Sequence, residues 1–395
     1  MTERFDEAAA ARLERVPSRA LRLLAPRGSD FEGAESGRAA APEGPSRQGL
    51  PDSIDSGHIA RRLRAAQAML APDRGVIRDR DGEAQALADD LVGTARGAMD
   101  VLLEGGSRES LSFPQVLALE AVLHTRGRPA LRVEGDSLEE LSEDKHPGSG
   151  FWRIIQNQHE HAIIDAAAST GAVVVNDKMF SNGRPWVQGT AWLIAPDLAI
   201  TNRHVLFPPI GQILGRRRAG APTQARIKGD LDVLVDFAFD NGPARERRYR
   251  VLDVPFVSGP DDTIDVALLR LEQLPSSPPP LRVAAATLEA RELDRLYVIG
   301  HPGRMPDVPD AVRLVFNEPD ERKRVSYGET MDPDENHPQD LVYDPSTIGG
   351  FSGGSVFAFG APEVVALHYW GDAAAGNRAM TCAALRAHAV GAFLT

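Results

Sequence analysis

From residue 171 onward, the chain repeats one pattern, in which a short run of β-branched and aromatic residues is followed by a turn. The runs are AVVVN, VQGTAWLIA, LAITN, LDVLVDFAF, DVALLRLE, LYVIG, VRLVF, GSVFAF and EVVALHYW. Runs of this length and composition predict strands. Because no long helical pattern separates them, the sequence favours an antiparallel barrel or sandwich over a parallel α/β sheet.

The domain organisation follows from length and local composition, since 395 residues exceed one typical core. Residues 1–55 predict an N-terminal segment and, in their Gly-, Ser- and Pro-rich part, a flexible linker. Residues 56–133 contain three helical stripes of apolar side chains and predict a small all-α bundle. Residues 134–150 are acidic, end in Pro and Gly, and predict a second linker. Residues 151–395 hold the β-rich part, which begins with an amphipathic helix.

Composition limits the partners and the location that we expect. Apolar residues make up 42% and charged residues 25% of the chain, as in globular proteins. The net charge is −12 and both halves are acidic, which argues against nucleic-acid binding, and the basic runs 216–218 and 245–248 are expected in solvated loops. The longest apolar runs are too short to predict a membrane span. One cysteine, Cys382, and an N-terminus without a signal-like apolar core predict a cytoplasmic protein.

The strongest chemical signal is a serine between glycines, in the segment Thr347-Ile348-Gly349-Gly350-Phe351-Ser352-Gly353-Gly354-Ser355. Glycines on both sides allow sharp turns and a close approach of substrate. The amides of Gly350 and Ser352 are candidate donors to the oxyanion that develops during acyl transfer. Taken alone, a glycine-rich turn without chemistry also explains this segment.

A serine hydroxyl is a weak nucleophile near neutral pH, so it needs a histidine base and a carboxylate that orients the base. His204 follows two strand-like runs joined by a tight turn. Asp265 opens an apolar strand-like run, where a carboxylate can be buried against an imidazole. The chain therefore offers one candidate for each role, in the order His204, Asp265, Ser352.

Three segments carry a family resemblance: G-T-A-W-L-I…T-N-R-H-V around His204, D-V-A-L-L from Asp265, and G-F-S-G-G-S around Ser352. They resemble the trypsin-like (chymotrypsin-fold) serine peptidases, in their bacterial glutamyl-endopeptidase-like branch. The resemblance implies a C-terminal all-β double β-barrel of two six-stranded barrels, preceded here by the all-α module. It also implies that His204 is the general base, Asp265 its orienting partner and Ser352 the nucleophile.

Two departures from the trypsin pattern bear on activation and specificity. Phe351 stands where zymogen-activated trypsins carry an aspartate, so activation by a newly formed N-terminal ion pair is not expected. Ser346 stands at the pocket floor, where enzymes that prefer Lys or Arg carry an acid, so that preference is not expected either, and Ser346 is a candidate substrate-binding residue. The segments around Thr347 and His368 resemble glutamyl endopeptidases, which implies that these two side chains bind a substrate carboxylate. Cleavage after Glu or Asp is therefore favoured over cleavage after small or apolar residues.

Other histidines are weaker candidates for chemistry. His159 and His161 point to different sides of a helix and lack the H-E-x-x-H spacing, so we expect no metal site, and the sequence indicates no cofactor. His301 lies in a strand-and-turn element that resembles one in bacterial peptidases, and we expect it to be structural.

The preferred hypothesis is therefore a serine endopeptidase that acts on protein or peptide substrates. Residues 56–133 are expected to bind a regulatory protein partner, an architecture that resembles effectors of bacterial conflict systems. The alternative is a catalytically inactive peptidase-fold protein that serves as a binding or scaffold module. An esterase with the same acyl chemistry also remains open.

Overall fold

The computed structural model describes residues 128–394, with internal gaps at 143–144, 147, 179–184, 209–211, 273–276, 286–293, 304–314, 317–319, 332, 334–336 and 373–375. The predicted N-terminal segment and nearly all of the predicted helical bundle (56–133) lie outside the described residues.

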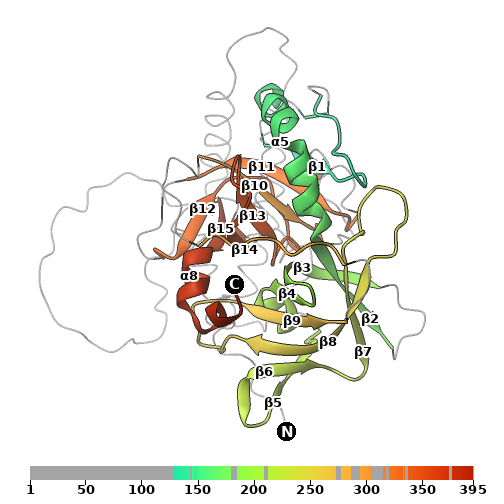
Figure 1. Cartoon of the computed structure of the whole chain (residues 1–395), viewed down its shortest axis with the longest axis vertical. Coiled ribbons are helices and arrows are strands. Elements are labelled where there is room, and N and C mark those ends of the chain that lie inside the picture. Colours follow the sequence, from blue (N-terminus) through green and yellow to red (C-terminus); the bar gives the residue numbers. More distant parts are fainter. Residues whose placement is uncertain are drawn as a thin grey trace, which may run out of the picture.

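The first of two antiparallel sheets forms the green and yellow half of the molecule (Figure 1). Its strands are β2 (Thr170–Asp177), β3 (Trp186–Ala195), β4 (Leu198–Thr201), β5 (Gly215–Arg218), β6 (Ala221–Ile227), β7 (Leu231–Asp236), β8 (Arg248–Val257) and β9 (Ala267–Leu271). Their order is β5-β6-β8-β7-β2-β3-β4-β9, and β8 also pairs with β9. This second pairing closes the sheet into a barrel.

The second sheet has the order β1-β11-β10-β13-β14-β15-β12. Its strands are β1 (Ala130–Arg132), β10 (Arg295–Gly300), β11 (Arg324–Glu329), β12 (Asp340–Tyr343), β13 (Ser355–Ala358), β14 (Val364–Asp372) and β15 (Gly376–Thr381). An isolated bridge between Thr330 and Tyr343 joins the ends of β11 and β12, so this sheet also curls on itself. The predicted double β-barrel is confirmed, with eight and seven described strands in the two sheets instead of six each.

Helix α5 (Gly150–Ala168) precedes the first barrel, as predicted. Its buried stripe includes Trp152, Ile155 and Ile163, as expected of an amphipathic helix. The Trp152 ring lies 5.6 Å from Tyr327 of the second barrel, measured between ring centroids. Three short helices in the described ranges are α6 (Arg203–Leu206), α8 (Cys382–Ala387) and the 3-10 helix η3 (Ala389–Phe393).

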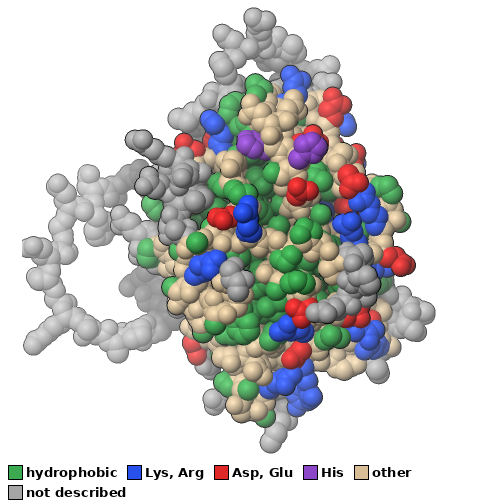
Figure 2. Space-filling view, viewed as in Figure 1, with side chains coloured by type: hydrophobic (Ala, Val, Ile, Leu, Met, Phe, Trp, Pro, Cys, Tyr) green, Lys and Arg blue, Asp and Glu red, His purple; other side chains and the backbone are tan. Residues whose placement is uncertain are grey.

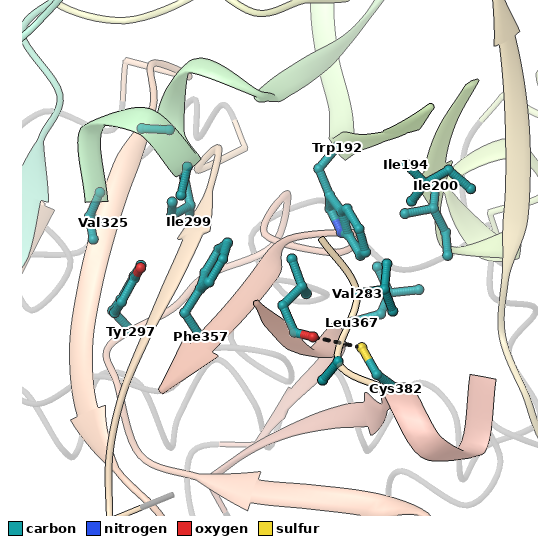
Figure 3. Close-up of a cluster of buried hydrophobic side chains, with 14 of the residues drawn as sticks. Trp192, Ile194, Ile200, Val283, Tyr297, Ile299, Val325, Phe357, Leu367 and Cys382 are labelled. Atoms are coloured by element: carbon teal, nitrogen blue, oxygen red, sulfur yellow. Dashed lines mark hydrogen bonds between the residues drawn. The ribbon is translucent and has the colours of Figure 1, made fainter. Parts of the chain in front are cut away.

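The largest apolar core lies between the two barrels (Figure 3). Trp192 and Ile200 enter it from the first barrel, and Ile299, Phe357 and Leu367 enter it from the second. Each fully buried side chain of this size contributes about 1.5–3 kcal/mol. The barrels are therefore held together by a continuous apolar core. 

Cys382 closes one edge of that core (Figure 3). Its thiol donates to the Val364 carbonyl at 3.1 Å, and burial raises the pKa of the thiol to about 12. A thiol that stays protonated is a poor nucleophile, so this cysteine acts as an apolar core residue.

The boundary expected at 134–150 is wrong. Strand β1, which lies within the range expected for the helical bundle, pairs with β11 of the second barrel. Leu138 and Leu141 are buried in the main core, so residues 134–150 are not a loose linker. A strand of three residues is too short to show an alternating pattern, which is why the sequence did not reveal it.

Two further expectations about local structure are corrected. The run Arg216-Arg217-Arg218 forms β5 and not a solvated loop, and Arg217 packs over the Phe207 ring at 5.1 Å. Charged residues on an exposed hairpin hide the strand pattern. The run expected as a strand at 312–316 is helical in its two described residues, Val315 and Phe316.

Acidic and basic side chains are interspersed on the face shown in Figure 2.

Lys323 is a buried polar link between the barrels. Its ammonium donates to the carbonyls of Ala167, at the end of α5, and of Phe237, just after β7, at 2.6 and 2.8 Å. Lys323 itself directly precedes β11 of the second barrel. Burial lowers the pKa of Lys323 to about 8, although Asp240 and Asp236 oppose this effect.

This pKa predicts a pH-dependent stability. Between pH 8 and the ordinary lysine value of 10.5, the unfolded chain binds more protons at Lys323, so stability rises with pH. The excess stability of the wild type over Lys323→Met should therefore increase across this window, by up to about 3 kcal/mol. Urea unfolding at several pH values measures it. Lys178→Met, at an exposed lysine, is the control, and an excess independent of pH would contradict the prediction.

Candidate active site

His204 and Asp265 are brought together by neighbouring strands. Strand β4 ends two residues before α6, which carries His204, and β9 begins two residues after Asp265. The two strands pair antiparallel, with Thr201 opposite Ala267. The ends of the two strands that carry the base and the acid are thus held at the same edge of the first barrel.

The acid holds both the ring and the backbone of the histidine. One Asp265 oxygen lies 2.7 Å from Nδ1 of His204, and the other accepts the His204 backbone N–H at 3.1 Å. The Asp265 side chain is 1% exposed, whereas that of His204 is 24% exposed. With Nδ1 bound to the acid, Nε2 is the ring nitrogen left to take a proton from a nucleophile.

The Ser352 loop is anchored to both barrels. The Ser352 carbonyl accepts the Thr190 amide of β3 at 2.8 Å, and the Gly353 amide donates to the His368 carbonyl of β14 at 2.8 Å. Gly353 needs its glycine, because φ is +88° and a Cβ would lie 1.9 Å from the Thr190 carbonyl oxygen. The loop can therefore approach the first barrel closely.

Gly189 fixes the distance between the base and this loop. A Cβ at Gly189 would lie 2.7 Å from a Val205 methyl group and 3.1 Å from the Ser352 carbonyl oxygen. The Val205 side chain, next to His204, and the Ser352 backbone thus meet across one glycine. Among the residues that the structure describes, no hydrogen bond joins the Ser352 hydroxyl to the His204 ring.

The loop geometry leaves amides available for an oxyanion. The Gly349 carbonyl accepts the Gly303 amide at 2.5 Å, and the Gly350 carbonyl accepts the Thr190 hydroxyl at 2.9 Å. In a trans peptide the C=O and N–H groups point in opposite directions, so the Gly350 N–H faces away from Gly303. In the described part of the chain, the amides of Gly350 and Ser352 donate no backbone hydrogen bond.

Phe351 anchors the loop by packing. It is fully buried, its ring lies 6.0 Å from Phe316 and 6.4 Å from His368, and it covers Gly300. The position that carries an aspartate in zymogen-activated trypsins is thus held here by apolar contacts. Such contacts do not depend on a newly formed N-terminus.

The three expected specificity residues differ in what their polar groups do. The Ser346 hydroxyl donates to the Arg128 carbonyl at 3.0 Å. The Thr347 hydroxyl donates to the Asn377 side-chain oxygen, and the Asn377 amide in turn donates to the Pro345 carbonyl at 2.6 Å. Because an Asn oxygen only accepts, the single Thr347 proton is already used.

His368 stands apart from these two residues. Its Nδ1 lies 2.6 Å from the Tyr343 hydroxyl, and the residue is 3% exposed. Burial, and to a lesser degree the nearby His204, lower the pKa of His368 to about 3. The imidazole is therefore neutral at physiological pH and lies in the electrostatic range of the base.

Sequence reasoning missed Thr190, Tyr343 and Asn377. Thr190 supports the site three times, through its contacts to Ser352 and Gly350 and by accepting the backbone amide of His301 at 3.0 Å. It belongs to the G-T-A-W motif, which was the available signal. Tyr343 and Asn377 carry no local signal, because their partners are 25 and 30 residues away in the chain.

The remaining candidate histidines lie outside this site. His159 packs edge-on against Phe359 with 5.7 Å between the ring centroids, and His161 is exposed. His301 is fully buried, and its Nδ1 donates to the Glu321 carbonyl at 3.1 Å. Within the described ranges, no three His, Cys, Asp or Glu side chains are grouped so that they could hold a metal ion. The search of these ranges for long apolar helices finds none that could cross a membrane.

Part of the two-barrel fold is similar to a known protein family. Residues 189–367 match the family model described as "Trypsin-like peptidase domain". This segment of the chain is therefore similar to trypsin-like peptidases. The matched range includes His204, Asp265, Ser352 and the close approach at Gly189. The curated proteins include no match to this chain.

Solved structures similar to this chain include two proteases and one inactivated protease paralogue. The serine endoprotease from Yersinia pestis is 16% identical, with a TM-score of 0.38, and the match covers 60% of this chain and 66% of that one. The scabies mite inactivated protease paralogue S-I1 is 12% identical, with a TM-score of 0.36, and the match covers 55% of this chain and 91% of that one. The VesB protease of Vibrio cholerae is 13% identical, with a TM-score of 0.35, and the match covers 56% of this chain and 62% of that one. The chain thus spans just under two thirds of the Yersinia and Vibrio proteins.

The contact at Gly189 predicts the effect of one added methyl group. Gly189→Ala should destabilise the two-barrel fold by about 1–3 kcal/mol, because the new Cβ overlaps Val205 and presses on the Ser352 backbone. Gly229→Ala is the matched control, since nothing lies within 4 Å of its Cβ position. Urea unfolding should separate the two variants, and equal stabilities would contradict the geometry.

Proposed function

We propose that the peptidase domain is an active serine endopeptidase that hydrolyses peptide bonds through an acyl-enzyme. The observation that carries the proposal is the buried Asp265 carboxylate bound to the ring of His204, next to a glycine-rich loop that presents Ser352. A base oriented by a buried acid, with a serine on an adjoining loop, is the arrangement that nucleophilic acyl transfer requires.

The proposed reaction assigns one step to each group. His204 Nε2 takes the proton of Ser352 Oγ as that oxygen attacks the scissile carbonyl carbon. The amides of Gly350 and Ser352 stabilise the negative oxygen of the tetrahedral intermediate. The imidazolium, stabilised by Asp265, then protonates the leaving amine. A water molecule, activated by the same base, hydrolyses the acyl-enzyme and releases the free serine.

A fluorophosphonate probe tests whether Ser352 is an activated nucleophile. The wild type should be labelled, whereas Ser352→Ala should not be labelled and should lose about a millionfold in peptide turnover. Ser355→Ala is a matched control three residues away, because its hydroxyl hydrogen-bonds to Thr170 at 2.9 Å and has no role in the reaction. A wild type that is neither labelled nor active would favour the alternative of an inactive binding or scaffold protein. Ester and peptide substrates assayed in parallel distinguish a peptidase from an esterase.

The role of the acid can be measured separately. Asp265→Asn should lower kcat/KM by about ten-thousandfold, because an amide at this position favours the wrong tautomer of His204. The fold should persist, since the amide keeps the size of the carboxylate. If kcat/KM for one peptide substrate is less than tenfold lower in Asp265→Asn than in the wild type, His204 does not depend on this acid.

We further propose cleavage after Glu or Asp. His368 supports this preference, because its Nδ1 contacts the Tyr343 hydroxyl, whose pKa burial raises well above its usual range. If this protonated hydroxyl donates to Nδ1, the proton of the neutral imidazole lies on Nε2 and can be donated to a substrate carboxylate. Thr347 contributes less, because its proton is donated to Asn377.

Peptides that differ only in Glu or Gln before the cleaved bond test the preference. His368→Leu should reduce the ratio of kcat/KM values for Glu over Gln by about 10–100-fold, the value of a hydrogen bond to a charged group. Thr347→Val should change the ratio much less. Cleavage of a denatured proteome mainly after aromatic or basic residues would rule out the preference.

We also keep the proposal that residues 56–133 bind a regulatory partner in a cytoplasmic effector. Strand β1 and Arg128 restrict the test, since Arg128 donates to Asp344 and Glu329 of the second barrel at 2.6–2.8 Å. A deletion that removes the expected helical bundle should therefore end before Arg128, and should not extend to the end of the expected linker at residue 150. Unchanged hydrolysis and partner binding after deletion of residues 1–126 would remove the regulatory claim.

A further inference from the structure

Arg203, directly before His204, is an almost fully buried cation beside the acid of the site. Its side chain is 3% exposed, and its Nε lies 3.9 Å from the Asp265 oxygen that accepts the His204 backbone amide. Burying a guanidinium costs free energy unless charge and hydrogen bonds compensate for it. The nearby carboxylate supplies the charge, so the two buried groups stabilise each other's ionised form.

The same guanidinium also holds the loop that delivers Asp265. Its Nη1 donates to the carbonyl of Gly259, lies 3.5 Å from the carbonyl of Asp262, and lies 3.4 Å from the Ser258 hydroxyl. Ser258 Oγ in turn accepts the amide of Val266, at 3.2 Å. The Arg203 guanidinium thus connects the residue next to His204 to several points on the loop from 258 to 265.

We propose that Arg203 is a positioning residue for the triad acid, an inference that rests on the proposed function. Its charge favours the ionised Asp265 and opposes protonation of His204. Its fork fixes the loop so that Asp265 meets the His204 ring. Its contacts described above lead to Asp265 and to the loop that carries Asp265, so it acts on the reaction through Asp265 and His204.

Three other ionisable side chains on elements around this pair have partners or charge states that the structure shows. On the same loop, Asp262 is bound through its side chain to His388 near the C-terminus, at 2.8 Å. From β5, Arg217 donates to the Ser258 carbonyl at 2.8 Å. From β14, His368 is neutral. Arg203 contacts the Asp265 carboxylate through Nε, at 3.9 Å.

The sign of the expected pH effect follows from the charge. Activity requires an ionised acid and a neutral base, and a positive charge at position 203 favours both. Replacing Arg203 with a neutral side chain should therefore move the acid limb of the kcat/KM profile to higher pH, by about one unit. Lysine keeps the charge but lacks the planar fork, so Arg203→Lys should keep the limb within about 0.3 units and lower kcat through a looser loop.

The experiment compares full-length wild type, Arg203→Met, Arg203→Lys and the control Arg270→Met. Arg270 is an arginine of β9 that pairs with Asp197 at 2.7 Å, away from the site. We expect the limb to shift only in Arg203→Met, kcat to fall at least tenfold in both Arg203 variants, and KM to stay within twofold. An unshifted limb in a folded Arg203→Met variant, or a change confined to KM, would overturn the proposal.

A second measurement separates this inference from the proposed function and covers a Met variant that fails to fold. The ring nitrogen signals of His204, followed by NMR in labelled full-length protein, report its protonation whether or not the chain hydrolyses peptides. If the wild type is inactive, the proposed function fails, while a His204 titration that moves to higher pH in Arg203→Met still supports the inference. If only Arg203→Lys folds, the signal of the Nδ1 proton bound to Asp265 should broaden or be lost, and an unchanged signal together with unchanged kcat would refute the positioning role.

Discussion

A carboxylate buried at the edge of the first barrel is the feature on which the site depends. Asp265 is 1% exposed and binds both the ring and the backbone amide of His204. An isolated buried carboxylate would cost several kcal/mol, so its neighbours must compensate for it. Pairing of β4 with β9 provides the position, and the adjoining Arg203 provides the opposite charge. The burial that makes the acid costly also strengthens its interaction with the ring.

The second requirement is that two barrels approach each other closely enough to share a site. The core around Trp192 and Phe357 joins the barrels through buried apolar side chains, and Lys323 adds a polar link through two backbone carbonyls. At the site itself the approach is made between backbones, at Gly189 and Gly353, where a side chain would collide. The glycines near Ser352 therefore serve contact between the barrels as well as the shape of the loop.

The part of the site that depends on short local patterns could be predicted from the sequence. His204, Asp265 and Ser352 each lie beside a strand-like run, and the resemblance of these segments to trypsin-like peptidases made them the candidate triad before any geometry was known. The many short apolar runs without helices between them indicated an antiparallel barrel or sandwich, and the resemblance implied the double barrel. Strand β1 was missed because three residues show no period, and β5 was missed because arginines occupy it. The contact of Thr347 with Asn377 joins residues thirty positions apart, which no local pattern reveals.

The sequence by itself determined the chemical groups and the strand pattern, because side-chain type and local periodicity are properties of neighbouring residues. The short strand-like runs predicted an antiparallel barrel or sandwich, and the resemblance of three segments to trypsin-like peptidases implied the double barrel and the candidate triad. The lack of an acid at position 346 is likewise a property of the sequence. Tertiary structure decided which polar groups remain available. It committed the Thr347 proton, made His368 neutral by burial and placed Arg203 against Asp265. These outcomes depend on desolvation and on contacts between distant segments, which exist only once the two barrels have packed.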